Sequence, residues 1–226
     1  MIRLHVICEG QTEELFVNEV LMSLFLPKQI LLQPSLIGKP GHKGGNINFD
    51  RLFPDIRNRL LGDPFAFCTT LFDFYGLAAS FPGKELAKQQ TAIDQKARCI
   101  CEAMEFNLRQ RLGEDPLRRF IPYVQMHEFE GLLFSDPRAF AAALSRPDLH
   151  SRIASIRDDF ATPEDINDNP LSAPSKRIQS LFPGYEKPLH GSLVALETGL
   201  DMFRRECHLF NDWIARLESL DSRSSE

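Results

Sequence analysis

The sequence of residues 2–13 is IRLHVICEGQTE, and it predicts how the fold begins. Residues 2–8 are apolar and rich in β-branched side chains, which is the pattern of a buried β-strand. Gly10 permits a sharp turn, and we expect Thr12 to cap the following helix, with Glu13 in its first turn. Glu9 then follows the carboxyl end of a strand, at the edge where open α/β sheets bind ligands.

The composition is that of an ordinary globular protein. The chain has 226 residues, of which 43% are hydrophobic and 25% are charged. No apolar run approaches the ~20 residues of a membrane helix, and the first strand is not followed by a signal-peptide cleavage site. We therefore expect a cytoplasmic protein with no membrane contact. The five cysteines lack metal-ligand spacing, so we expect free thiols.

The net charge of −5 argues against a surface that is basic throughout, although a local basic patch and bound metals can still hold a phosphodiester. Residues 38–48, GKPGHKGGNIN, have two interpretations. They are a solvated linker, or they are a flap whose Lys39, His42 and Lys43 contact phosphate. Their spacing does not match a P-loop.

Strand patterns recur at residues 29–37, 65–72 and 119–125, with helical patterns between them, including one that begins at Asn48 or Asp50 and one over 83–113. This alternation predicts a mainly parallel four-stranded α/β sheet flanked by helices. Beyond residue 136 we expect short helical pieces between prolines, and then helices over 191–199 and 202–219. We therefore predict an α/β core over 1–136 and a C-terminal helical extension, packed on it, over 137–226.

Acidic residues follow three of the predicted strands: Glu9, Asp73, and the pair Glu128 and Glu130. Parallel strands bring such ends to one edge, where converging carboxylates must share protons or cations. Hard oxygen ligands suit Mg²⁺ or Mn²⁺, and these metals suit phosphoryl chemistry. The alternative is that each acid caps a helix or lies on the surface.

The segment HEFE, residues 127–130, is not a zinc motif, because residue 131 is glycine rather than part of a His-Glu-x-x-His pattern. If this segment is helical, Glu128 and Glu130 point in different directions, so we expect one of them to enter the site and the other to cap a helix or form a salt bridge. His127 either orients a carboxylate or a water, or it is a structural histidine.

The pattern Glu9-Gly10-Gln11-Thr12-Glu13, with a later strand that ends at Asp73, resembles the TOPRIM fold of topoisomerases, primases and overcoming-lysogenization-defect (OLD) nucleases. The resemblance implies a TOPRIM- or Rossmann-like sheet and divalent metal held by Glu9 and Asp73, with Glu13 also used as in the OLD-like branch. The chain departs from the TOPRIM pattern at Tyr75, which stands where a second aspartate is expected.

More of the chain resembles the bacterial domain-of-unknown-function family number 4276. The shared pieces are DFYG (73–76), FPG (81–83), HEFE (127–130), APSKR (173–177) and YxKxxHG (185–191). This resemblance implies a phage-defence context and an AAA-type ATPase as a partner.

Basic residues follow prolines in the C-terminal part. The OLD resemblance implies a lysine that neutralises the scissile phosphate, for which Lys176 and Lys187 are the candidates. We expect Arg177 to clamp phosphate and His190 to contact it. The alternative is ordinary ion pairing with Glu164, Asp165 or Asp168.

These patterns together lead to a Mg²⁺- or Mn²⁺-dependent nuclease, or a related phosphodiester-cleaving enzyme, that acts on DNA or RNA. Its predicted metal ligands are Glu9, Asp73, Glu128 and Glu130, and its predicted catalytic residues also include Glu13, His127 and Lys176. The alternative is a non-catalytic partner or sensor subunit of an AAA-type ATPase, which Tyr75 favours. A small-molecule phosphatase or nucleotide-binding enzyme would use the same acids.

Overall fold

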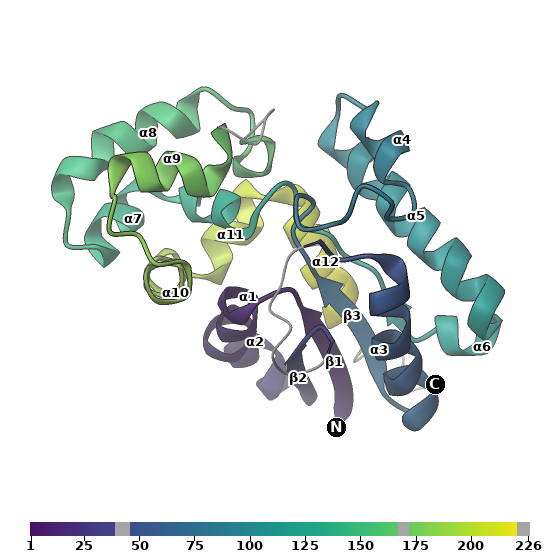
Figure 1. Cartoon of the computed structure of the whole chain (residues 1–226). Helices are drawn as coiled ribbons and strands as arrows, with labels where there is room; N and C mark the ends of the chain where they lie inside the picture. The colour runs from purple at the N-terminus through teal and green to yellow at the C-terminus, as the bar shows by residue number, and fades with distance from the viewer. Residues whose placement is uncertain (39–45, 167–171, 221–226) are drawn as a thin grey trace.

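The computed structural model describes residues 1–38, 46–166 and 172–220. At its centre is a four-stranded parallel sheet with the order β2-β1-β3-β4 (Figure 1). The strands are β1 (Ile2–Cys8), β2 (Ile30–Leu36), β3 (Phe67–Leu71) and β4 (Phe120–Ile121). The predicted parallel α/β sheet with flanking and C-terminal helices is therefore confirmed.

Strand β4 is much shorter than the predicted strand over 119–125. Pro122 follows Ile121 directly and has no backbone N–H, so it cannot continue the ladder as a donor. The chain nevertheless stays beside the end of β3, where Gln125 forms an isolated bridge with Asp73 and its backbone N–H donates to the Phe72 carbonyl at 2.7 Å. This extension keeps residues 127–130 at the carboxyl edge of the sheet.

Helices cover both faces of the sheet (Figure 1). On one face, Leu4 and Val6 share a hydrophobic cluster with Phe210 and Trp213 from the C-terminal helices. On the other face, Ile7 and Phe72 belong to a cluster built with the helices between residues 49 and 112. Inward-facing residues alternate along β1 between the two clusters, as expected for a strand that is covered on both sides.

The first half contains α1 (Gln11–Phe16), a π-helical turn (Val17–Leu21), α2 (Met22–Phe25), a 3₁₀ turn (Leu26–Lys28), α3 (Phe49–Gly62), α4 (Lys84–Lys88), α5 (Ile93–Leu112) and α6 (Glu114–Leu117). Asn48 caps α3, as expected, by accepting a hydrogen bond from the Arg51 N–H at 2.8 Å. Residues 83–113 are mostly helical, as expected, with the 20-residue α5 as the long helix, but the chain leaves helical geometry between α4 and α5.

The second half contains the 3₁₀ helix η3 (Phe129–Ser135), α7 (Pro137–Ala143), η4 (Pro147–Leu149), α8 (His150–Asp158), η5 (Pro163–Asp165), α9 (Pro174–Leu181), α10 (Lys187–Thr198), α11 (Leu200–Glu206) and α12 (His208–Glu218). Two predicted boundaries change. Helix α10 begins at Lys187 rather than Gly191, and the predicted helix 202–219 is interrupted at Cys207, whose backbone is extended.

Helix α12 is fixed to the sheet by Trp213. Its ring stacks on Tyr123 with 4.4 Å between ring centroids, and its Nε1–H donates to Thr69 Oγ1 on β3 at 2.9 Å. Trp213 is therefore a core residue. All five cysteines are free thiols, as expected. Within the described residues, no helix has the length and apolarity to cross a membrane.

Candidate functional site

Five acidic residues and one lysine interact at the carboxyl edge of the sheet, and we name them the acidic cluster: Glu9, Glu13, Asp73, Glu128, Glu130 and Lys187. Glu9 follows β1, Asp73 follows β3, and the glutamates at 128 and 130 follow the extension of β4. Helices α1 and α10 supply Glu13 and Lys187. The cluster brings together all of the acids that the sequence singled out as metal ligands.

Glu9 joins the ends of the two central strands. Its Oε2 accepts a hydrogen bond from the backbone N–H of Asp73 at 3.1 Å. The same carboxylate lies where a Cβ atom on residue 76 would be, so only glycine leaves room for it there. The turn of residues 73–76 therefore holds Glu9 from two sides.

The start of α1 differs from the prediction. Gly10, not Thr12, is the residue before the helix, and Glu13 reaches back so that its Oε2 accepts from the Gly10 N–H at 2.8 Å. Thr12 lies inside the first turn and is buried, where a Cβ on Gly191 of α10 would lie 3.4 Å from its Cγ2. Thr12 therefore packs toward α10, and Glu13 is the side chain that accepts from the backbone at the start of α1.

Asp73 connects β3 to the segment that carries the two glutamates. Its Oδ1 accepts from the backbone N–H of Phe129 at 2.7 Å, at the first residue of η3. Asp73 is 8% exposed. Its carboxylate therefore satisfies a free helix donor and fixes the position of the 127–130 segment.

The expectation that one glutamate of this segment enters the site, while the other caps a helix or forms a salt bridge, agrees with a buried Glu130 and with a Glu128 that caps α9. Both form ion pairs with the Lys187 ammonium, Glu130 through Oε2 at 2.9 Å and Glu128 through Oε1 at 3.9 Å. Glu128 precedes the 3₁₀ helix in an extended conformation, so the α-helical directions assumed in the prediction do not apply. Glu128 Oε2 also accepts from the Ser175 N–H of α9 at 2.9 Å.

The negative charge of the cluster is only partly balanced. Burial, followed by the repulsion of neighbouring carboxylates, raises the pKa of Glu9 and raises that of Asp73 well above its usual range. Burial likewise raises the pKa values of Glu13 and Glu130 to about 7. For Lys187, burial alone would lower the pKa, but the carboxylates of Glu130, Asp73 and Glu128 outweigh burial and raise it.

Two buried polar atoms of this region have no hydrogen-bond partner within the described ranges: Glu130 Oε1 and the Tyr185 hydroxyl oxygen. Glu130 is 1% exposed and Tyr185 is 6% exposed. The Tyr185 oxygen would lie 3.1 Å from a Cβ on Gly191, at the point where α10 packs against α1. Buried polar atoms of this kind are uncommon, and a bound water, ion or ligand is the usual partner.

The cluster fits a hard divalent cation by donor chemistry. Its carboxylate oxygens are the ligands that Mg²⁺ and Mn²⁺ prefer, and Glu130 Oε1 is an unused acceptor. In the part of the chain that the structure describes, however, no three acidic, histidine or cysteine side chains are already arranged to hold a metal ion. Binding would therefore require Lys187 to leave Glu130, or other side chains to turn.

The other predicted contacts lie apart from these ion pairs. Lys176 is exposed and donates to Gln179 Oε1 at 3.4 Å, and Arg177 donates to the Ser172 carbonyl at 2.8 Å. His190 Nδ1 accepts from the Glu186 N–H at 2.8 Å. Lys187, rather than Lys176, is thus the lysine among the acids. Lys43, with Lys39 and His42, lies outside the described residues.

His127 and Tyr75 lie next to each other beside the cluster. Their ring centroids are 5.4 Å apart, and the backbone N–H of Tyr75 donates to the His127 carbonyl at 3.1 Å. His127 is 2% exposed and also contacts the ring of Phe74 edge to face. Tyr75 is therefore part of an aromatic contact with His127.

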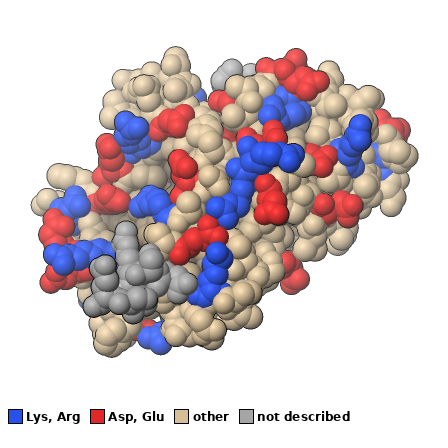
Figure 2. Space-filling view, turned by 180° about the vertical axis from the view of Figure 1, so that it is seen from behind, with Lys and Arg blue, Asp and Glu red and all other residues tan. Residues whose placement is uncertain are grey.

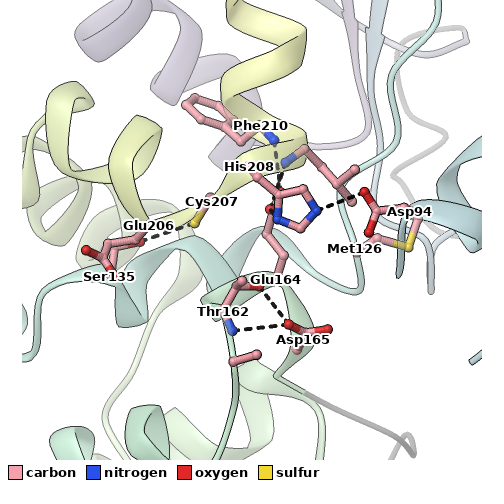
Figure 3. Close-up of polar contacts among 12 residues, drawn as sticks. Asp94, Met126, Ser135, Thr162, Glu164, Asp165, Glu206, Cys207, His208 and Phe210 are labelled. Atoms are coloured by element: carbon pink, nitrogen blue, oxygen red, sulfur yellow. Dashed lines mark hydrogen bonds and ion pairs between the residues drawn. The ribbon is translucent and has the colours of Figure 1, made fainter. Parts of the chain in front are cut away.

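Glu164 does not pair with Lys176 or Arg177 in the described structure. Its two carboxylate oxygens accept from the backbone N–H groups of Leu209 and Phe210, each at 2.9 Å, and so cap α12 (Figure 3). His208 lies between Glu164 and Asp94, and its Nε2 is 3.0 Å from Asp94 Oδ1. This network fixes η5 and α5 to the start of α12. Asp165 bonds to Thr162, and Asp168 is outside the described residues.

Sequence reasoning missed two residues that support the cluster: Gly76, which admits the Glu9 carboxylate, and Lys84, which is buried under the turn of residues 73–76. Glycine in a turn is common, and the segment KELAK, residues 84–88, has the composition of a surface helix. Neither residue type carries a local signal for this role.

A family model described as "Domain of unknown function (DUF4276)" matches residues 8–218. No curated protein and no solved structure matches the chain.

Proposed function

The chain belongs to the DUF4276 family, and from that premise we propose that it is a Mg²⁺- or Mn²⁺-dependent phosphodiester-cleaving enzyme, a nuclease. The observation that carries the proposal is the acidic cluster, in which five carboxyl groups from four parts of the chain lie around one lysine. Concentrating uncompensated carboxylates at a sheet edge costs free energy, and a divalent cation would offset that cost. The TOPRIM-like order of Glu9 and Asp73 along the chain supports the same chemistry.

We propose that Glu9, Asp73, Glu128 and Glu130 hold the metal. Bound there, Mg²⁺ or Mn²⁺ supplies charge neutralisation for the phosphodiester and an activated water. Glu13, with a pKa of about 7, is suited to accept the proton of the attacking water near neutral pH. Lys187 keeps 40% of its side chain exposed, so its ammonium can turn from Glu130 toward a phosphate oxygen and oppose the charge that develops there.

The face of the molecule shown in Figure 2 fits a local nucleic-acid contact. On the face shown in Figure 2, Lys and Arg side chains lie among Asp and Glu side chains, and the net charge of the chain is −5. An extended basic track, which gives strong salt-dependent binding, is not the pattern on this face. We therefore propose that recognition depends on the metal, Lys187 and a few neighbouring contacts. From the family resemblance, we also propose that the protein acts in phage defence together with an AAA-type ATPase.

The second candidate is a non-catalytic partner or sensor subunit of such an ATPase. Two observations favour it: Tyr75 stands in place of a second aspartate, and Lys187 already partly neutralises Glu128 and Glu130. A subunit of this kind would keep the fold and the ion pairs but would need no metal.

The test is a cleavage assay on plasmid DNA, single-stranded DNA and RNA, with and without Mn²⁺. Wild type is compared with Glu9→Gln, and with Glu19→Gln, which changes an exposed acid in the π-helical turn after α1 as a control. We expect Mn²⁺-dependent cleavage by wild type and the control, and a loss of at least about 100-fold in Glu9→Gln. Full activity in Glu9→Gln would contradict the assignment. If no variant cleaves, with or without an ATPase partner, the non-catalytic subunit becomes the better account.

A further inference from the structure

Lys84 is a buried lysine that forms no ion pair within the described residues, although it feels the charges of Glu9 and Glu85. It is the first residue of α4 and is 4% exposed. Its Nζ donates a hydrogen bond to the Phe74 carbonyl and lies 3.4 Å from the centroid of the Phe74 ring. Within the described ranges it forms no ion pair with a carboxylate. Because an ammonium group in such a place loses its hydration, the arrangement is costly for the fold.

The acceptor of this bond lies in the turn that holds Glu9. The Asp73 N–H donates to Glu9 at 3.1 Å, and the backbone of Gly76 leaves the space for the same carboxylate. Phe74 lies between these two points, and the Gly76 N–H closes the turn on the Asp73 carbonyl at 3.0 Å. The bond from Lys84 therefore fixes the middle of a turn whose two ends both contact Glu9.

The backbone at the start of α4, which carries Lys84, packs closely against α5. Gly83 precedes it with a φ of 81°, in the left-handed region, and a Cβ there would overlap the carbonyl oxygen of Cys99 in α5. This close approach places the start of α4 directly on a 20-residue helix. Lys84 thus links the turn of residues 73–76 to α4, and α4 in turn packs on α5.

We propose that Lys84 is a positioning residue, which holds the turn of residues 73–76 so that Glu9 and Asp73 keep their places at the acidic cluster. The amine donates a hydrogen bond whether it is protonated or neutral, so this role does not depend on its charge. The effect of Lys84 on the turn is independent of the proposed function, whereas its effect on metal binding rests on that proposed function.

The first test is amide hydrogen exchange of wild type, Lys84→Met, Lys84→Arg and Lys88→Met. Methionine keeps the apolar stem but cannot donate, arginine keeps a donor, and Lys88 is an exposed lysine on the same helix. In Lys84→Met we expect the amides of residues 73–76 to exchange about tenfold faster, while those of β1 and α12 are unchanged. Lys84→Arg should restore much of the protection, and Lys88→Met should match wild type.

Unchanged exchange at residues 73–76 in Lys84→Met would overturn the proposal. So would faster exchange spread equally over the turn, β1 and α12, because Lys84 would then serve the stability of the whole fold.

The second readout is Mn²⁺ affinity, measured by calorimetry on the same four proteins. We expect Lys84→Met to bind about tenfold more weakly, with Lys84→Arg closer to wild type and Lys88→Met equal to it. Equal affinity in Lys84→Met and wild type would contradict a role at the cluster. If wild type itself binds no Mn²⁺, the proposed function fails, and the exchange measurement alone decides whether Lys84 positions the turn.

Discussion

The carboxylate of Glu9 occupies the space that a Cβ atom on residue 76 would need, so an acid that follows one strand lies directly against the turn that follows another. This relationship makes the acidic cluster sensitive to a single methyl group. The Asp73 N–H donates to the same carboxylate at 3.1 Å, so a displaced Glu9 would also lose this hydrogen bond.

We therefore expect Gly76→Ala to displace the Glu9 carboxylate and to abolish Mn²⁺ binding, while most of the fold persists. Gly62→Ala is the control, because a Cβ at residue 62 meets no atom within 4 Å. Calorimetric Mn²⁺ titration and circular dichroism check both variants. Wild-type Mn²⁺ affinity in Gly76→Ala would show that the contact between Glu9 and this turn is irrelevant to the metal.

The second prediction concerns Lys187, which forms ion pairs with Glu128 and Glu130. Lys187→Met should destabilise the protein at pH 7.5 by roughly 1–3 kcal/mol. This is less than the cost for a fully buried pair, because the Lys187 side chain is 40% exposed. Urea unfolding measures the change, and the exposed Lys176→Met is the matched control. We expect the loss to shrink at pH 5, where the carboxyl groups take up protons; an equal loss at both pH values would contradict the electrostatic explanation.

The third prediction is the pH dependence of wild-type stability. The pKa values of Glu13 and Glu130 rise from 4.5 to about 7 on folding, chiefly through burial. Between these values the folded protein binds more protons than the unfolded chain, so the free energy of unfolding should fall as the pH rises from about 4.5 to about 7. At about 1.4 kcal/mol per pKa unit, each of the two shifts corresponds to a decrease on the order of 3 kcal/mol.

Urea unfolding at pH 5, 6, 7 and 8 checks this direction. Millimolar Mn²⁺ should recover much of the loss at pH 7.5, because a ligand that binds only the folded state stabilises it. Stability that rises steadily with pH over the same interval would contradict the account of the cluster.

The sequence was a good guide where a pattern is local. The β-branched, apolar run before Glu9 predicts β1, and the acids after the strands predict which carboxylates share the sheet edge. The length of β4 was overestimated, because an apolar run is also buried when its strand pairing stops at Pro122. The acids at the sheet edge could be predicted because the alternation of strand and helix patterns indicates a parallel sheet, and a parallel sheet brings these strand ends together.

The rest depends on tertiary packing. Lys176 and Lys187 both follow prolines, and only the packing of α10 against α1 brings Lys187 to the acids. Glu128 and Glu130 reach the same lysine because their segment begins extended and continues as a 3₁₀ helix, which a short sequence pattern does not distinguish from an α-helix. Lys84 belongs to a helix that has the composition of a surface element, so its burial has no sequence signature.

The most direct test of the account is a calorimetric Mn²⁺ titration of wild type and Glu9→Gln at pH 7.5. Glutamine keeps an acceptor for the Asp73 N–H but removes a charge from the acidic cluster. If the acidic cluster is a metal site, we expect wild type to bind Mn²⁺ in the micromolar to millimolar range and Glu9→Gln to bind it at least about tenfold more weakly. The absence of binding by wild type, or equal affinity in the two proteins, would contradict the claim that the cluster is a metal site.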